Sequence, residues 1–189
     1  MIKKLFKAHE QNGFALIEML MAIAISGLII AGIVDVTVQT IVINAAHNSR
    51  MTAIKQVENA IHWIERDAQM ASSKSIEPSD STVTDFPLEL SWTHFEDNYT
   101  HFITYRVDNG VLLRREVVKD IAEAENEELI SDTETMICNN VIAADSNYAF
   151  NAEILEVNLT VTVSGFRSAT ESRTLYVMPR VNKEVEQDD

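Results

Sequence analysis

The stretch Gly13-Phe14-Ala15-Leu16-Ile17-Glu18-Met19-Leu20 opens the part of the chain that decides its fold. It begins an apolar run from Phe14 to Val34 in which Glu18 is the only charged residue. At a rise of 1.5 Å per residue, a helix of this length is about 30 Å long, which matches the hydrocarbon core of a bilayer. The run therefore predicts a helix that crosses a membrane.

The residues on either side of the run indicate its orientation. Lys3, Lys4 and Lys7 precede it and Asp35 follows it, which predicts a cytoplasmic N-terminus and an exported C-terminal part. A secretory signal peptide is a poorer interpretation, because the run is too long and no small-x-small cleavage site follows it. A buried core helix is disfavoured by the length and the basic flank. A plain single-pass anchor explains the length but leaves Glu18 without a purpose.

Glu18 decides among these interpretations. A carboxylate inside an apolar membrane segment is costly, so such a group usually has a partner and a function. If the chain were cut before Phe14, a new α-amino group would lie one helical turn from Glu18. That ammonium, in this chain or in a neighbouring one, is a suitable partner for the carboxylate.

The segment from Gly13 to Leu20, with its basic leader and the apolar run behind it, closely resembles the processing and methylation site of type IV prepilins and pseudopilins. The resemblance implies that a prepilin peptidase cuts between Gly13 and Phe14 and that Phe14 is then N-methylated. It further implies that Glu18 guides the registration of subunits during filament assembly. Ala15 stands where the family usually has threonine.

One of two positions distinguishes this chain from major pilins, which have a glycine and a later proline around a helical segment that loosens in the filament. Gly27 matches the glycine, whereas Asp35 stands where the proline is often found. The departure favours a pseudopilin or a minor subunit. The sequence leaves open whether the helix is continuous after Gly32.

A second helical pattern follows the apolar run. Apolar residues recur at spacings of three and four, which predicts one buried stripe of a helix that continues to about residue 72. The stripe consists of Ile54, Val57, Ile61, Ile64, Ala68 and Ala71. A serine-rich stretch with Pro78 then ends the helix.

Beyond the helix, the pattern becomes typical of strands. We expect strands at 88–92, 101–107, 111–118, 154–163 and 174–181, with a hairpin turn at Asp108-Asn109-Gly110 and an edge position near Pro179. The predicted fold is α+β: a long N-terminal helix packed on an antiparallel sheet of about four to six strands. The expected domains are a removed leader at 1–13, a transmembrane and filament-core helix at 14–34, an amphipathic helix at 35–75 and a β-rich head at 76–189.

The composition of the chain limits the kinds of molecule that it is expected to bind. The formal net charge is -14 and the pI is near 4.7, so the bulk of the chain is not expected to bind nucleic acid. Cys138 is the only cysteine, which excludes an intramolecular disulfide, and we expect it to be a small buried residue.

No motif for catalysis or for a cofactor is found, and we expect no enzymatic activity and no metal. His94 and His101, with Glu96 and Asp97 between them, match no zinc pattern. The acidic cluster at Glu123, Glu125, Glu127 and Glu128 lacks the alternation and the central glycine of a calcium loop.

The head resembles the family more loosely. Glu65-Arg66-Asp67-Ala68 and the segment Tyr105 to Arg114 are similar to J-type minor pseudopilins and PilW-type minor pilins. The resemblance implies a structural subunit at or near the tip of a type II secretion pseudopilus. Its implied partners are other pseudopilins or pilins, the prepilin peptidase and the bacterial inner membrane, with the head on the exported side. Two alternatives stay open: a minor pilin of a type IV pilus that serves adhesion, motility or DNA uptake, and a membrane-tethered head that binds a ligand or catalyses a reaction.

Overall fold

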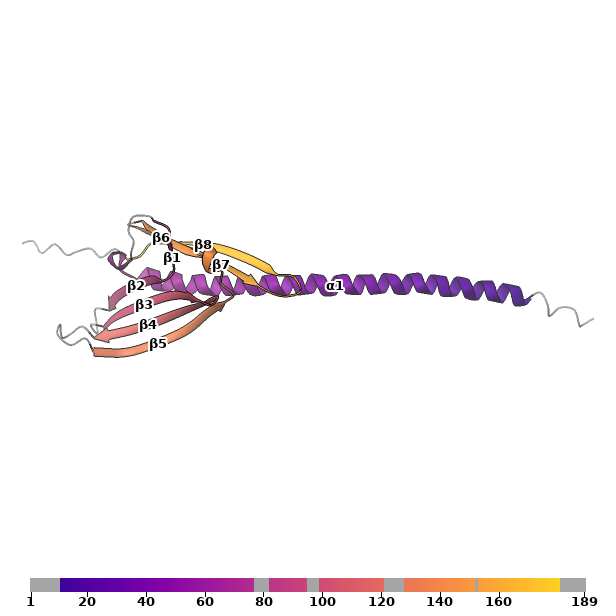
Figure 1. Cartoon of the computed structure of the whole chain (residues 1–189), viewed down its shortest axis with the longest axis horizontal. Helices are drawn as coiled ribbons and strands as arrows, with labels where there is room; N and C mark the ends of the chain where they lie inside the picture. Colours follow the sequence, from indigo (N-terminus) through magenta and orange to yellow (C-terminus); the bar gives the residue numbers. More distant parts are fainter. Residues whose placement is uncertain (1–10, 77–81, 95–98, 121–127, 152, 181–189) are drawn as a thin grey trace, which may run out of the picture. The chain divides into compact units, whose positions relative to one another are not determined.

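The computed structural model describes residues 11–76, 82–94, 99–120, 128–151 and 153–180. Its first element is a single helix, α1 (Gln11–Met70), which runs without interruption past Gly32 (Figure 1). The chain divides into two compact units, Met1–Ala45 and Ala46–Asp189.

The part of α1 in the first unit is apolar on every side. All side chains from Leu16 to Ile41 are exposed, including the large ones such as Leu28 and Ile30. The helix is long and apolar enough to cross a membrane, and none of its apolar segment is buried within the protein. The fit to a single-pass anchor therefore agrees with the prediction from the sequence.

The part of α1 in the second unit is amphipathic. Its buried stripe consists of Ala53, Val57, Ala60, Ile64, Asp67, Ala68 and, just beyond the helix, Ala71. The predicted stripe is correct at Val57, Ile64, Ala68 and Ala71, but Ile54 and Ile61 are only partly buried. Small alanines, Ala53 and Ala60, are fully buried in the centre of the stripe in their place. The larger isoleucines then lie at the margin of the stripe.

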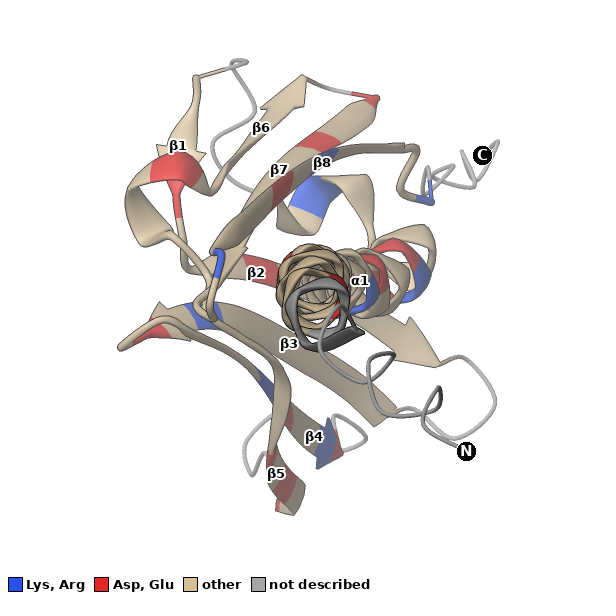
Figure 2. Cartoon of the chain, turned by 90° about the vertical axis from the view of Figure 1, so that its right-hand side faces the viewer, with Lys and Arg blue, Asp and Glu red and all other residues tan. Residues whose placement is uncertain are grey.

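Two antiparallel sheets of four strands each are found in the described residues. One contains β2 (Leu88–His94), β3 (Tyr99–Asp108), β4 (Val111–Asp120) and β5 (Glu128–Asn139) in that order. The other contains β1 (Thr84–Asp85), β6 (Asn147–Asn151), β7 (Ile154–Val163) and β8 (Ala169–Val177). Figure 2 looks along α1 and shows one sheet on each side of it. The α+β class is confirmed, although the prediction placed the strands in a single sheet.

The bounds of some strands were predicted correctly, and other strands were not predicted. The prediction for 154–163 has the bounds of β7, and those for β2, β3 and β4 agree to within two residues. β8 begins five residues before the expected start at Thr174 and ends at Val177, so Pro179 follows the strand. β1, β5 and β6 were not predicted.

The turn between β3 and β4 agrees with the sequence. Asn109 has a φ of 50° and Gly110 a φ of 76°, which is the backbone of a type I′ hairpin turn. Glycine tolerates this left-handed conformation without steric cost. Cys138, near the end of β5, is buried as expected.

The chain after α1 is fastened to both sheets. A short 3-10 helix, η1 (Ser73–Ser75), follows α1, and a second one, η2 (Ala143–Asp145), precedes β6. The Ser72 N–H donates to the Ser91 carbonyl of β2, and the Arg180 N–H donates to the Ala71 carbonyl. The last turn of α1 therefore lies between β2 and the segment that follows β8.

Candidate assembly site

Glu18 lies in the second turn of α1 with its side chain exposed. Gly13 and Phe14 are in the first turn, four or more residues before it, so Phe14 and Glu18 are separated by a rise of about 6 Å. The side chains of residues 11–15 and all of the predicted leader before Gln11 lie outside the described residues. The backbone thus places the three predicted site residues on adjacent turns of one helix.

The surroundings of Glu18 are apolar. The apolar side chains next to Glu18 in the sequence are all more than half exposed. They are Leu16, Ile17, Met19 and Leu20. The chain has no Lys or Arg from Ala8 to Ser49. A cation that pairs with Glu18 must therefore be a chain terminus or come from another molecule.

The next charged residue of α1, Asp35, is satisfied locally. Gln39 Nε2 donates to Asp35 Oδ2 over 2.9 Å. The Thr37 hydroxyl donates to the Ile33 carbonyl, and the Thr40 hydroxyl donates to the Val36 carbonyl, each over 2.8 Å. This belt of polar side chains makes its hydrogen bonds within the helix, whereas no hydrogen bond of that kind is found for Glu18 in the described residues.

Residues 9–34 match the family model described as the prokaryotic N-terminal methylation motif. The match supports the type IV pilin-like class. It covers Gly13, Phe14, Glu18 and the apolar run, and it does not extend into the head. No curated protein and no solved structure matches the chain significantly. The type IV pilin-like motif thus agrees with the sequence prediction, and the J-type or PilW-type assignment rests on the sequence resemblance alone.

The head of this pilin-like chain contains a buried charge cluster, centred on Asp67, that the sequence analysis did not find. Asp67 is fully buried, and its Oδ2 accepts hydrogen bonds from the Tyr105 hydroxyl and from Arg114 Nε, each over 2.6 Å. Burial, together with the negative charge of Asp67, raises the pKa of the Tyr105 phenol well above its ordinary value. Tyr105 therefore stays protonated and donates its hydroxyl hydrogen to Asp67.

The cluster continues along β4 to His101. Arg114 Nη1 donates to Glu116 Oε2 over 2.7 Å, and Glu116 Oε1 lies 3.0 Å from His101 Nδ1. His101 in turn stacks on Trp92 at a centroid distance of 5.2 Å. One of the two histidines considered as metal ligands is thus engaged by a glutamate and an indole.

The charges in this cluster stabilise one another. Burial alone would lower the pKa of the Arg114 guanidinium, but hydrogen bonds to Asp67 and Glu116 outweigh burial and raise it. Burial alone would raise the pKa of Glu116, but hydrogen bonds from Arg114 and His101 lower it. Both groups therefore remain charged in the folded head near neutral pH.

The cluster joins the two head segments that carry the looser family resemblance. Asp67 belongs to the segment Glu65 to Ala68 at the end of α1, and Tyr105 and Arg114 belong to the β3–β4 hairpin. A signal for Asp67 existed in the sequence. It lies three residues after Ile64 and seven after Ala60, which is a position on the buried stripe rather than on the solvated face.

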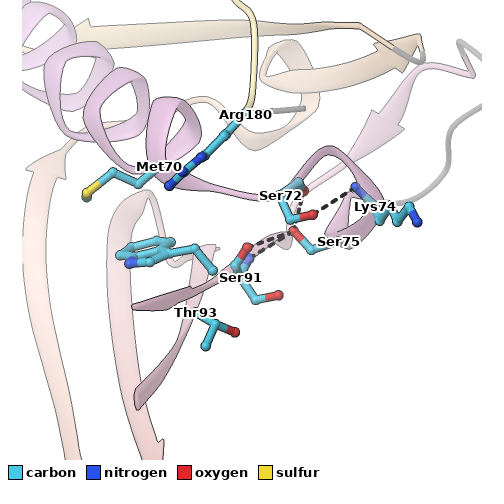
Figure 3. Close-up of a pocket in the computed structure, with 8 residues that line it drawn as sticks. Met70, Ser72, Lys74, Ser75, Ser91, Thr93 and Arg180 are labelled. Carbon is cyan, nitrogen blue, oxygen red and sulfur yellow. Dashed lines mark hydrogen bonds between the residues drawn. The ribbon is translucent and has the colours of Figure 1, made fainter. Parts of the chain in front are cut away.

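A pocket of about 480 Å³ lies where α1 ends (Figure 3). Its hydroxyl groups are used to fasten the chain: Ser75 Oγ donates to the Ser72 carbonyl over 2.7 Å and accepts from the Ser91 N–H over 3.1 Å. The residues that line it, which also include Lys74, Thr93 and Arg180, contain no Asp, Glu or His. The lining therefore places no carboxylate and no imidazole beside its serines.

The structure describes only some of the residues that were considered as metal ligands. Among the residues that the structure describes, no group of three or more His, Cys, Asp or Glu side chains is placed to bind a metal ion. Glu128 begins β5, whereas Glu123, Glu125 and Glu127 lie outside the described residues. Glu96 and Asp97 also lie outside them.

Proposed function

We propose that this chain is a minor pseudopilin, most similar to the J type, which is cut between Gly13 and Phe14 and then enters the tip of a type II secretion pseudopilus. The observation that carries the proposal is the first part of α1. Its run from Leu16 to Val34 is exposed throughout and bears a single carboxylate, at Glu18, inside the segment that matches the methylation motif.

Assembly would use the charge of Glu18. Cleavage before Phe14 creates an α-ammonium, and a neighbouring subunit's ammonium is a cation that can reach the Glu18 carboxylate. In a surrounding of low dielectric constant, such a pair attracts much more strongly than in water. One axial register between two helices would satisfy both charges, so the pair selects that register.

The same mechanism fits a minor pilin of a type IV pilus, and one feature favours the secretion machine. The net charge of -14 disfavours a role in which the head contacts DNA. In either machine we expect a cytoplasmic N-terminus, a head outside the inner membrane, other pilin-like subunits as partners and no enzymatic activity.

The first experiment is the mass of the chain's N-terminal peptide after coexpression with a prepilin peptidase. We expect a mature chain that begins at N-methylated Phe14. A chain that still begins at Met1, while a control prepilin is cut in the same cells, would contradict the proposal and favour a plain membrane anchor.

A second experiment tests registration. Glu18→Val should still be inserted and cut, but its incorporation beside the other subunits should fall at least about tenfold, which corresponds to about 1.4 kcal/mol. Ser26→Val, a polar-to-valine change within the same run, is the matched control and should assemble normally. Equal incorporation of both variants would refute the registration role.

A further inference from the structure

The strand β5 (Glu128–Asn139) forms one edge of its sheet. It has 12 residues, is therefore about 40 Å long, and pairs with β4 on one side only. In an antiparallel ladder, alternate N–H and C=O groups point away from the partner strand. In the part of the chain that the structure describes, no segment pairs with this outer side of β5. Figure 2 shows β5 at the outer end of the sheet, beyond β4.

The opposite edge of the same sheet is covered at its middle. The Ser72 N–H donates to the Ser91 carbonyl of β2 over 2.9 Å, and Ser75 Oγ accepts from the Ser91 N–H over 3.1 Å. The chain that leaves α1 thus covers the edge of β2 at Ser91, whereas the edge of β5 has no strand beside it within the described ranges.

The side chains of β5 do not block its edge. From Glu128 to Met136 they are exposed on both faces of the sheet, except for the half-buried Ser131. Leu129, Ile130 and Met136 are 57%, 46% and 60% exposed. The strand contains no Lys, Arg or Pro, and Lys and Pro are residues with which proteins commonly protect a free edge. A long edge that exposes apolar side chains is a template for pairing with another strand.

The acidic residues in the middle of β5 are directed across the sheet. Asp132 accepts from Arg115 of β4 over 2.6 Å, and Glu134 accepts from Arg106 of β3 over 2.8 Å. These ion pairs hold both carboxylates over the neighbouring strands. The outer backbone beside Thr133 is therefore accessible.

Charge excludes a second copy of this chain as the best partner. When two β5 strands pair antiparallel about a two-fold axis on any one residue from Ser131 to Glu134, two carboxylates face each other. The axis at Thr133, for example, places Asp132 opposite Glu134. Like charges directly opposite each other destabilise a strand pair. A strand with basic or neutral side chains fits this acidic edge better.

We propose that the outer edge of β5 is where an extended segment of a different pilin-like subunit adds a strand to the sheet β2-β3-β4-β5. Main-chain hydrogen bonds supply the affinity, and the side chains that alternate along the strand supply the specificity. The partner segment carries apolar residues opposite Leu129, Ile130 and Met136 and at least one Lys or Arg near Asp132. The proposal rests on the proposed function, because it takes the partner from the same filament.

The test uses the full chain in cells that assemble the complete machine. A photo-crosslinking amino acid, p-benzoylphenylalanine, replaces Thr133, and in a parallel strain it replaces Thr174 of β8, the exposed edge strand of the other sheet. After irradiation, mass spectrometry identifies the crosslinked peptide. The N-terminal peptide of the same chains is measured to show whether they were cut before Phe14.

Two double variants then test whether the partner subunit recognises the edge of β5. Ile130→Lys/Met136→Lys adds two positive charges and removes two exposed apolar side chains from β5. Thr174→Lys/Tyr176→Lys makes the same change in charge on β8, where both side chains are also exposed. Near-ultraviolet circular dichroism of the purified full chain in detergent shows whether each head has folded.

We expect position 133 to crosslink to an extended segment of another subunit that carries the N-terminal methylation motif. The yield should fall at least about tenfold in the β5 double variant and stay within about twofold in the β8 double variant. Should the β5 double variant fail to fold, the crosslink from position 133 in the otherwise unchanged chain decides the matter.

Three outcomes would overturn the proposal: a crosslink only to a second copy of this chain, no crosslink at position 133 beyond that at position 174, or equal losses in the two double variants. If the chain is cut and methylated when one of these is seen, only the edge proposal fails. An uncut chain would overturn the proposed function and the edge proposal together.

Discussion

The two parts of α1 have the same backbone and opposite surfaces. Residues 16–34 are apolar around the helix apart from Glu18 and Ser26 and are exposed throughout, whereas residues 46–70 bury one stripe and leave the rest partly or fully exposed. The second part finds its apolar partner within its own chain, in the two sheets of the head. The first part has no such partner among the described residues, so its apolar surface must be covered by lipid or by other helices.

The comparison separates two kinds of charged residue. Asp67 and Glu18 are both carboxylates among apolar side chains of one helix. Asp67 accepts hydrogen bonds from the β3–β4 hairpin and from Arg66, whereas no hydrogen bond to Glu18 is found in the part of the chain that the structure describes. A carboxylate that pairs with a group of its own chain stabilises the fold. A carboxylate without such a group is available to pair with another subunit during assembly.

The largest effect should come from removing the carboxylate of the head. Asp67→Asn leaves the Arg114 side chain, which is only 6% exposed, without its buried counter-charge, so we expect a loss of about 3–5 kcal/mol in the unfolding free energy of the head. Urea unfolding of the full chain in detergent measures this through the fluorescence of Trp63, whose ring lies under Arg66 and Arg114.

The control for this variant replaces the whole charge cluster. In Asp67→Leu/Tyr105→Phe/Arg114→Met, no buried polar group of the trio is left unpaired, and most of the lost stability should return. An unfolding free energy for Asp67→Asn within about 0.5 kcal/mol of the original would show that the cluster does not hold the helix to the hairpin.

A pair of isoleucine variants tests the apolar surfaces of the two parts directly. Ile64→Ala removes a fully buried side chain and should cost about 3 kcal/mol of head stability through lost burial and a residual cavity. Ile30→Ala, at an exposed position, should change head stability by less than about 0.5 kcal/mol. Similar losses for both in urea unfolding would mean that the first part of α1 also packs against the head.

The pH dependence of the head should reveal Glu116. Its pKa in the folded head lies below the ordinary value of 4.5, since the hydrogen bonds from Arg114 and His101 outweigh burial. The resulting stabilisation is present above about pH 4.5 and is lost as the pH falls through the folded value. Glu116→Gln should flatten this part of the stability profile. An unchanged slope between pH 5 and 3, measured by urea unfolding at fixed salt, would assign the acid sensitivity to other groups.

The smallest effect is expected at the surface ion pair between Arg50 and Glu171. These groups lie 2.8 Å apart and join the helix to β8, but the Arg50 side chain is 67% exposed. Arg50→Ala should therefore cost about 0.2–1 kcal/mol, and the difference should vanish near 1 M salt because salt screens exposed charges. A difference that persists at high salt would indicate packing of the Arg50 stem rather than charge.

The sequence predicted the parts of the fold that a local pattern marks. The apolar run was predicted from its length and composition, the end of the helix from the serine-rich stretch with Pro78, and β7 from the alternation of its side chains. β5 was missed because its exposed part, Glu128 to Met136, has no buried face and so shows no alternation. β6 was missed because it is short and bounded by asparagines, although Tyr148 and Phe150 alternate with polar residues and are buried.

The functional residues differ in the same respect, because some could be predicted from a local motif and Asp67 could not. Gly13, Phe14 and Glu18 were predicted because a local motif carries them, and the structure adds their place on the first turns of α1. Asp67 could not be recognised with the same ease, because its partners Tyr105 and Arg114 lie 38 and 47 residues away in sequence. The role of a charged residue on an apolar stripe can be recognised only when the folded structure shows which groups pair with it.

The fastening of the chain around Ser72 also has a mechanical meaning. Ser72 is held to β2 through the Ser91 carbonyl, and the residues on both sides of it are held to Arg180, through the Ala71 carbonyl and the Ser73 N–H. A tension applied to the end of α1 is therefore passed to β2 and to the segment after β8 through these three backbone hydrogen bonds.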